Sequence, residues 1–304
     1  MNIDCVGDAL APATIAARRI LVVFNPVAGR KRRPKLDAVL AALKPIAPFT
    51  LIETTQRGDA ERIAASADPA EVDLIAAAGG DGTVNEVVNG LKGKRIALGV
   101  IPLGTANVLA DEMGLPRRTE AVARALAFGS LQPIRVGVAN GRRFVMMAGA
   151  GFDANVVHRV SLALKKKIGP LAYVLETFKL AFSDAFQECD VVIDGVAHRT
   201  VSTVVCNGRH YGGPFVAAPP ASLRDDLFHV VLLKGRGWLS VARYGLALIS
   251  GRLPRLSDVA IVPGRSVELA GLADQPLQVD GDVVTALPAR IEIDAEPVML
   301  AYPS

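Results

Sequence analysis

The chain has 304 residues, 51% of them hydrophobic, with a formal net charge of +4 and a pI near 9.0. This length is comfortable for two domains. No run approaches the roughly 18 uncharged apolar residues of a membrane span, which excludes a transmembrane helix, and the start lacks a signal-peptide pattern. The mild basic excess suits anionic partners such as nucleotide phosphates, acidic membranes or nucleic acid, without selecting among them.

Strand-like and helix-like segments alternate over the first 130 residues. One helix is expected to open at Pro34, and another to stop at Gly114 before Pro116. Two more helical patterns cover 59–67 and the residues after 82. The expected strands are the apolar runs 20–24, 49–53, 73–78 and 96–101. This alternation predicts βαβ units and a mostly parallel sheet.

Hairpin signals replace the alternation after Gln132. Asn140-Gly141 and Asp194-Gly195 each separate two strand-like runs, as in tight antiparallel hairpins. A helical stretch at 171–182 follows a basic run at 165–167; a core-facing helix with a solvated basic start is favoured over a membrane-docking helix. Further strands are expected at 228–233, 259–262, 266–269 and 276–279. The second half is therefore predicted to be an antiparallel β domain. The three cysteines form no CxxC pair and are expected to be reduced cytosolic thiols.

The strongest local motif opens the helix after the third expected strand. It consists of Gly79, Gly80, Asp81, Gly82, Thr83, Val84, Asn85 and Glu86. Ligands of α/β sheets bind at such strand ends, where glycines let a phosphate approach the main chain and the helix N-terminus offers free N–H groups. Asp81 is suited to act on a metal or a metal-bound water. A tight turn that merely needs glycine is the alternative, and the embedded Asp, Thr and Asn-Glu count against it.

Two further loops follow neighbouring strands. One is Asn25-Pro26-Val27-Ala28-Gly29, with Arg30 and Lys31 after it, and the other is Pro102-Leu103-Gly104-Thr105-Ala106-Asn107. Neither is a Walker A loop, and each alone fits ordinary turn chemistry. Three such loops at one edge of a sheet predict a nucleotide site.

Together, these three loops resemble the N-terminal motifs of the diacylglycerol kinase catalytic-domain family, which includes bacterial lipid kinases and the sphingosine and ceramide kinases. The segment 149–154, Gly-Ala-Gly-Phe-Asp-Ala, is similar to the family's G-x-G-x-D element, and Asp280-Gly281-Asp282 stands in the place of its late D-G-E. The resemblance covers the chain from about residue 19 onward. It implies an ATP-binding α/β domain with a mostly parallel sheet, residues 1–131, and a second antiparallel β-sandwich domain for the lipid substrate, residues 132–287. The tail, about 288–304, is expected to return to the first domain.

Site residues follow from this resemblance. It implies that ATP is surrounded by Asn25, Pro26, Val27, Ala28, Gly29, Thr54, the residues from Gly79 to Glu86, and Thr105. Thr54 is placed by its spacing to Gly58-Asp59-Ala60. It further implies a Mg²⁺ held by the Asp225 side chain and main-chain groups of Ser222 and Leu227, although Asp226 stands where the family usually has Gly.

The catalytic base is expected at Asp282 or Asp280, because a carboxylate near the attacking hydroxyl accepts its proton during phosphoryl transfer. Asp282 stands where the family has the longer Glu. The alternative is a plain Asp-Gly hairpin turn.

We therefore expect an ATP- and Mg²⁺-dependent kinase that phosphorylates a lipid hydroxyl, with diacylglycerol as the leading acceptor. It is expected to be cytoplasmic and peripheral on the inner face of the membrane. Sphingoid-base or phosphatidylglycerol phosphorylation, NAD kinase activity and a non-catalytic nucleotide-binding regulatory module are the alternatives. Nucleic acid is not expected as a partner, and the sequence leaves the oligomeric state open, a homodimer included.

Overall fold

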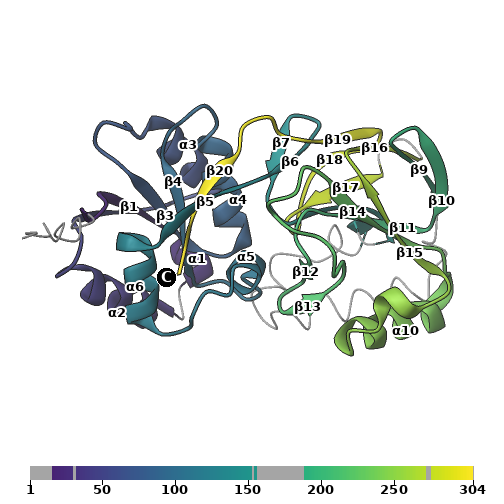
Figure 1. Ribbon diagram of the computed structural model, residues 1–304, viewed down its shortest axis with the longest axis horizontal. Coiled ribbons are helices and arrows are strands. Elements are labelled where there is room, and N and C mark those ends of the chain that lie inside the picture. Colours follow the sequence, from purple (N-terminus) through teal and green to yellow (C-terminus); the bar gives the residue numbers. More distant parts are fainter. Residues whose placement is uncertain (1–15, 30–31, 153, 156–187, 272–274, 304) are drawn as a thin grey trace, which may run out of the picture.

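A computed structural model describes residues 16–29, 32–152, 154–155, 188–271 and 275–303. An α/β part and a β-rich part lie side by side (Figure 1). The helical stretch expected at 171–182, the basic run at 165–167 and Asp153 of the G-x-G-x-D element lie outside the described residues.

The sheet of the first part contains β1 (Ile20–Phe24), β2 (Phe49–Glu53), β3 (Leu74–Gly79), β4 (Ala97–Pro102), β5 (Ser130–Ile134) and β20 (Val298–Tyr302). Its strand order is β2-β1-β3-β4-β20-β5, and only β5 runs antiparallel to its neighbour. Every residue of β1, β3 and β4 is buried, as expected for parallel strands covered on both faces. The alternation of strands and helices in the sequence therefore gives the predicted parallel sheet.

Helices cover both faces of this sheet. One face carries α2 (Arg33–Leu43) and α6 (Thr119–Phe128); the other carries α3 (Asp59–Ser66), α4 (Asp81–Gly90) and α5 (Val108–Glu112). α2 buries Leu36, Val39 and Leu43, whose spacing places them on one side of the helix. The core beneath α4 continues through Met146 and Met147 into the β-rich part, so the two parts share apolar packing.

The β-rich part contains two antiparallel sheets, with strand orders β10-β9-β16-β19-β6-β7 and β15-β14-β11-β8-β17-β18. Their core includes the stacked rings of Phe144 and Phe228, whose centroids are 5.9 Å apart. The strands are β6 (Gly137–Ala139), β7 (Arg142–Phe144), β8 (Met147–Gly151), β9 (Cys189–Ile193), β10 (Val196–Thr200), β11 (Ser202–Cys206), β14 (Phe228–Leu233), β15 (Val259–Gly264), β16 (Ser266–Ala270), β17 (Pro276–Val279), β18 (Asp282–Ala286) and β19 (Ala289–Ile293). This arrangement confirms the predicted fold class.

Left-handed turn residues explain the hairpins. Asn140 and Asp194 have φ of 48° and 46°, and each precedes a glycine that also has positive φ. Asn and Asp tolerate this conformation, so both predicted hairpins form. Asp280 has φ of 48° before Gly281 and forms the same kind of turn between β17 and β18.

The end of the chain returns to the first part. β19 lies in the second part, whereas the next strand, β20, lies between β4 and β5 in the first sheet. The predicted boundary at residue 131 falls inside β5. Helix α10 (Gly237–Ile249) and the small strands β12 (His210–Tyr211) and β13 (Phe215–Val216) also belong to the second part. Among the described residues, none of the helices combines the length and apolar character that a membrane span requires.

Candidate active site

The three predicted loops meet because they follow the adjacent strands β1, β3 and β4. Asn25 donates a hydrogen bond from Nδ2 to the Thr83 hydroxyl at 3.1 Å, and its Oδ1 accepts the amide of Val27 at 3.0 Å. The amide of Gly104 donates to the carbonyl of Gly79 at 3.0 Å. The first loop continues as the short helix α1 (Pro26–Gly29), where Val27 is 64% exposed. These bonds fix the three loops to one another.

Glycine is required at two of these positions, because neighbouring atoms leave no room for a Cβ. A Cβ on Gly104 would lie 2.4 Å from the Cα of Gly80, and one on Gly79 would lie 2.3 Å from the Thr83 hydroxyl oxygen. Gly82 differs, because a Cβ there would meet only the carboxylate oxygen Oδ2 of Asp282, at 3.1 Å. Of these glycines, Gly82 is the one that faces a functional side chain from the second part.

Asp81 binds the start of α5. Its Oδ1 accepts the amide of Val108 at 2.7 Å and its Oδ2 accepts that of Asn107 at 3.0 Å. Burial raises the pKa of Asp81 to about 6, although the Val108 hydrogen bond opposes this effect. Asn107 in turn holds the third loop, since its Oδ1 accepts the Gly104 amide at 2.7 Å. In this structure Asp81 therefore joins the glycine loop to the loop that contains Thr105, which is exposed.

Asn85 and Glu86 point away from the glycine loop. Glu86 accepts the amides of Gly58 and Ala60 at 3.0 and 3.1 Å, so it binds the start of α3. Asn85 donates to the carbonyl of Arg143 and to Oδ2 of Asp280, both at 2.9 Å. These two residues of the motif organise the surroundings of the site, and the side chain of Val84 packs in the core beneath α4.

The loop after β2 is fixed by Asp59. Its Oδ2 accepts the amide of Thr55 at 2.8 Å, the hydroxyl of Thr55 at 2.7 Å and the amide of Gln56 at 3.1 Å, while Arg62 donates to its Oδ1 at 2.8 Å. The bonds from Thr55, followed by the one from Arg62, hold the pKa of Asp59 well below its usual range. Thr54 is buried at the end of β2, and its amide donates to the carbonyl of Phe24 at 2.8 Å.

Asp280 joins the two parts of the molecule. It accepts the amides of Val145, Met146 and Met147 at 2.8, 2.8 and 3.1 Å, in addition to the bond from Asn85 of α4. Burial raises the pKa of Asp280 despite these bonds. Four donors occupy the two oxygens. Asp280 therefore acts as a structural acceptor that connects α4 to the start of β8, which begins at Met147.

Asp282 has the opposite surroundings. Its side chain is 39% exposed, and Nη2 of Arg57 lies 3.6 Å from Oδ2. This is the same oxygen that faces Gly82 at the start of α4. Of the two candidate bases, Asp282 has a carboxylate that is accessible and aimed at the glycine loop.

Arg57 is a site residue that the sequence analysis missed. It is 69% exposed and reaches Asp282 from the loop after β2. The available signal was its position directly before Gly58-Asp59-Ala60, the segment that places Thr54. A guanidinium here is positioned to bind a phosphate.

The predicted metal segment, residues 222–227, contacts β5 and Arg135, the residue that follows this strand. Nε of Arg135 and Oδ1 of Asp226 form an ion pair at 2.5 Å, and the amide of Arg135 donates to the carbonyl of Leu223 at 2.6 Å. The amide of Asp225 donates to the carbonyl of Ser222 at 3.1 Å. Carboxylate and carbonyl oxygens are the donors that Mg²⁺ prefers, so the Asp225 side chain with main-chain groups of Ser222 and Leu227 fits such an ion in type. Among the described residues, no cluster of three or more His, Cys, Asp or Glu side chains is arranged to hold a metal.

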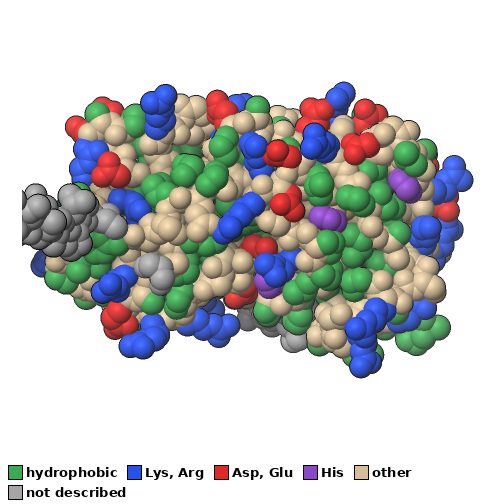
Figure 2. Space-filling view, in the orientation of Figure 1, with side chains coloured by type: hydrophobic (Ala, Val, Ile, Leu, Met, Phe, Trp, Pro, Cys, Tyr) green, Lys and Arg blue, Asp and Glu red, His purple; other side chains and the backbone are tan. Residues whose placement is uncertain are grey.

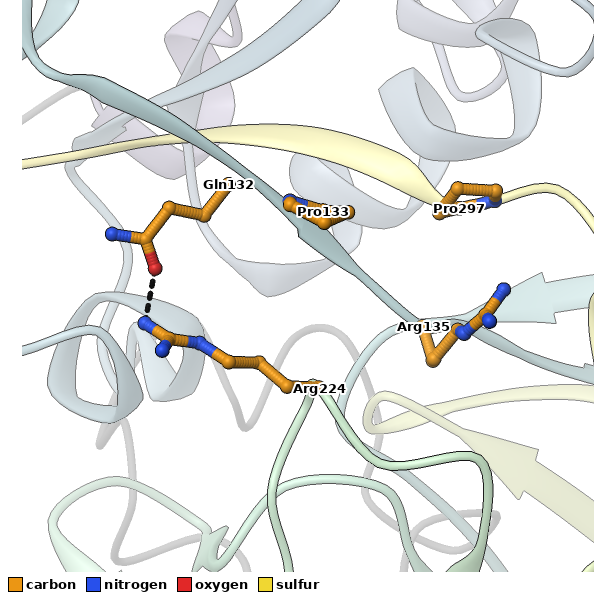
Figure 3. Close-up of a pocket in the computed structure, with 5 residues that line it drawn as sticks. All are labelled: Gln132, Pro133, Arg135, Arg224 and Pro297. Atoms are coloured by element: carbon orange, nitrogen blue, oxygen red, sulfur yellow. Dashed lines mark hydrogen bonds between the residues drawn. The ribbon is translucent and has the colours of Figure 1, made fainter.

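A groove of about 420 Å³ lies beside this segment (Figure 3). Arg224 bonds to Gln132 of β5 and stacks on the ring of Tyr302, 5.6 Å from its centroid. The lining consists of Gln132, Pro133, Arg135, Arg224 and Pro297. None of the predicted ATP-binding or base residues is among them, so this groove is separate from the glycine loops.

The chain is similar to known proteins along nearly its whole length. It matches the diacylglycerol kinase catalytic domain over residues 19–139 and the YegS C-terminal NAD kinase beta sandwich-like domain over residues 146–302. A diacylglycerol kinase of Bacillus subtilis (strain 168) is 32% identical over 280 residues, which covers 90% of this chain and 92% of that protein. One from Staphylococcus epidermidis is 27% identical, covering 90% and 88%. A crystal structure of a diacylglycerol kinase from Bacillus anthracis str. Sterne has a TM-score of 0.75 at 24% identity and covers 94% of this chain and 97% of that one.

The site consists of glycine loops at the carboxyl edge of a parallel sheet, faced by a carboxylate from the β-rich part, and the similar proteins are kinases. The fold and the sequence similarity agree on this class. The chain belongs to the diacylglycerol kinase catalytic-domain family.

Proposed function

We propose that this protein is an ATP- and Mg²⁺-dependent lipid kinase that transfers the γ-phosphoryl group of ATP to the hydroxyl of diacylglycerol. The observation that carries the proposal is the accessible Asp282 carboxylate, which faces Gly82 at the start of α4. The names of the similar proteins favour diacylglycerol as the acceptor.

Each residue of the proposed site has one task. The amides at the start of α4 face the phosphates, where the helix dipole favours negative charge. Asp282 accepts the proton of the attacking hydroxyl while the oxygen of that hydroxyl bonds to the γ-phosphorus. The bond between the γ-phosphorus and the bridging oxygen to the β-phosphate breaks, and ADP leaves. Arg57, whose guanidinium lies 3.6 Å from Asp282, binds the transferring phosphoryl group. Mg²⁺ that enters with ATP would neutralise phosphate charge at the glycine loops. A separate Mg²⁺ would be held by Asp225 with main-chain groups of Ser222 and Leu227.

NAD kinase is the second candidate, because the β-rich part matches a domain described as NAD kinase beta sandwich-like. Sphingoid bases and phosphatidylglycerol are further acceptors for the same chemistry. In the proposed setting the protein is cytoplasmic and acts at the inner face of the membrane, where its lipid substrate lies.

A transfer assay with ATP labelled in its γ-phosphate tests the proposal. Diacylglycerol, sphingosine, phosphatidylglycerol and NAD are offered separately, the lipids in detergent micelles, with and without Mg²⁺. We expect labelled phosphatidic acid that depends on Mg²⁺. Label on NAD alone, or on no acceptor, would contradict the proposal.

A further inference from the structure

Helix α10 presents an apolar face to solvent. Leu239, Leu246 and Ile249 are 65%, 69% and 66% exposed. The helical repeat places these three side chains within about 80° of one another around the axis. Trp238, on the same side, is 45% exposed. Clustered large apolar side chains on a surface mark an interaction site more often than isolated ones do.

The opposite face fixes the helix to the β-rich part. Tyr244 and Ala247 are buried in the core. The Tyr244 hydroxyl accepts the amide of Gly235 at 2.7 Å and donates to Asp258. The helix is therefore anchored, and its exposed face is not the result of loose attachment.

Positive charge surrounds this face. Residues 234–258, which include α10 and the segments that flank it, contain one acidic residue, Asp258, and five basic ones: Lys234, Arg236, Arg243, Arg252 and Arg255. Their net charge is +4, which equals that of the whole chain, so all other residues together carry no net charge. Lys and Arg side chains stand beside hydrophobic ones at the end of the molecule that carries α10 (Figure 2). Arg243 pairs with Asp258 and Arg236 with Glu188, while Arg252 and Arg255 are exposed next to the helix end.

We propose that α10 is a membrane-docking surface, whose apolar face enters the interface of an anionic phospholipid bilayer while the surrounding Lys and Arg side chains bind the headgroups. Apolar insertion and basic attraction together are what interfacial helices need. A symmetric dimer through this face would bring two segments of charge +4 together, which charge repulsion opposes. The need for a membrane partner rests on the proposed lipid kinase function. The apolar face and the positive charge of α10 are observed independently of that function.

The location of α10 suits this task. α10 packs against β13, and β12 packs against α5, the helix bound by Asp81 of the glycine loop. In Figure 1, α5, the β12–β13 hairpin and α10 lie along the same lower edge of the molecule. A bilayer that contacts α10 along this edge would therefore lie near α5, the helix that borders the proposed kinase site.

Vesicle flotation tests the docking surface in the full chain. The wild type is expected to float with phosphatidylcholine vesicles that contain phosphatidylglycerol, and much less with phosphatidylcholine alone. Leu246→Ser combined with Ile249→Ser should lower the binding constant at least about tenfold. Val196→Ser is the control, because Val196 is 60% exposed in the β9–β10 hairpin and should leave binding unchanged. Leu239→Ser provides an independent variant of the same face. An unfolding temperature equal to that of the wild type verifies that each of these variants folds.

Charge is tested separately. Arg252→Ala with Arg255→Ala should weaken binding to the anionic vesicles about tenfold or more, whereas Arg95→Ala with Arg124→Ala, which removes the same charge from exposed positions of the first part, should not. Three results would each overturn the docking surface. In the first, the variants of Leu239, Leu246 and Ile249 bind vesicles as well as the wild type; in the second, the two double Arg→Ala variants lose equal binding. In the third, the variants of the apolar face lose a dimer but keep vesicle binding.

Diacylglycerol phosphorylation in detergent micelles separates the two proposals. The face variants should keep micelle activity, because none of the changed residues belongs to the proposed site. A protein that binds vesicles through α10 but phosphorylates no lipid would refute the proposed function and support the docking surface. Micelle activity together with α10-independent vesicle binding would refute only the docking surface.

Discussion

Asp280→Asn tests whether this buried carboxylate joins the two domains. Each carboxylate oxygen accepts two hydrogen bonds, from three main-chain amides and Asn85. An amide has one oxygen, so two of these donors lose their acceptor and face an NH₂ group. A buried donor left unsatisfied costs about 1–3 kcal/mol. Part of this cost is offset, because burial raises the pKa of Asp280 and a neutral side chain avoids the desolvation of a charge. We expect the free energy of unfolding to fall by about 2–4 kcal/mol.

Urea unfolding at neutral pH, followed by circular dichroism, measures this loss. Asp282→Asn is the matched control two residues away, because its carboxylate is 39% exposed and its ion pair with Arg57 is also exposed. Such pairs contribute little, so we expect a change within about 0.5 kcal/mol. If Asp280→Asn unfolds at the wild-type urea concentration, or if both variants lose equal stability, the assignment of Asp280 to domain linkage is refuted.

Three further predictions concern the loops around the site. Gly82→Val should weaken ATP binding more than Asp282→Ala does, because its Cβ would stand 3.1 Å from Asp282 and the added methyls would fill the phosphate approach; unchanged affinity by calorimetry would move the site elsewhere. Arg57→Ala should lower turnover about tenfold or more by removing a charge-assisted phosphate contact, while the surface control Arg95→Ala should not, and equal turnover in both would remove Arg57 from the site. Asp59 has a depressed pKa in the folded state, so its stabilising effect is present above the ordinary Asp pKa of about 4 and is lost as pH falls. Acid unfolding of Asp59→Ala should therefore show a shallower loss of stability below that pH, and an identical slope would contradict the assignment.

The fold was accessible from the sequence because its signals are local. Strand and helix periodicities identify the first sheet, and Asn140 and Asp194 before glycine identify two hairpins whose left-handed geometry those residues tolerate. The end of the chain was different. β20 enters the first sheet between β4 and β5 through long-range pairing, and no local pattern specifies its partner. The family resemblance supplied that expectation.

Within the site, the motifs identified the loops but not the task of each side chain. Asp81 and Glu86 look like ligands in a linear sequence, yet their oxygens accept amides from α5 and α3. Asp280 and Asp282 are equivalent carboxylates in the sequence, and only the fold buries one and exposes the other. Arg57 was missed because it is contributed by another loop, and its proximity to Asp282 exists only in three dimensions. Hydrogen-bond partners and burial, which decide these tasks, are properties of tertiary packing.

The central claim is that Asp282 activates the lipid hydroxyl. The most direct measurement compares turnover of wild type, Asp282→Asn and Asp282→Glu with saturating ATP, Mg²⁺ and diacylglycerol in micelles. We predict that Asp282→Asn lowers turnover by about two to four orders of magnitude with wild-type ATP affinity, because an amide cannot accept the proton. Asp282→Glu should retain or raise activity. Wild-type turnover in Asp282→Asn would contradict the account, since the hydroxyl would then be activated by another group.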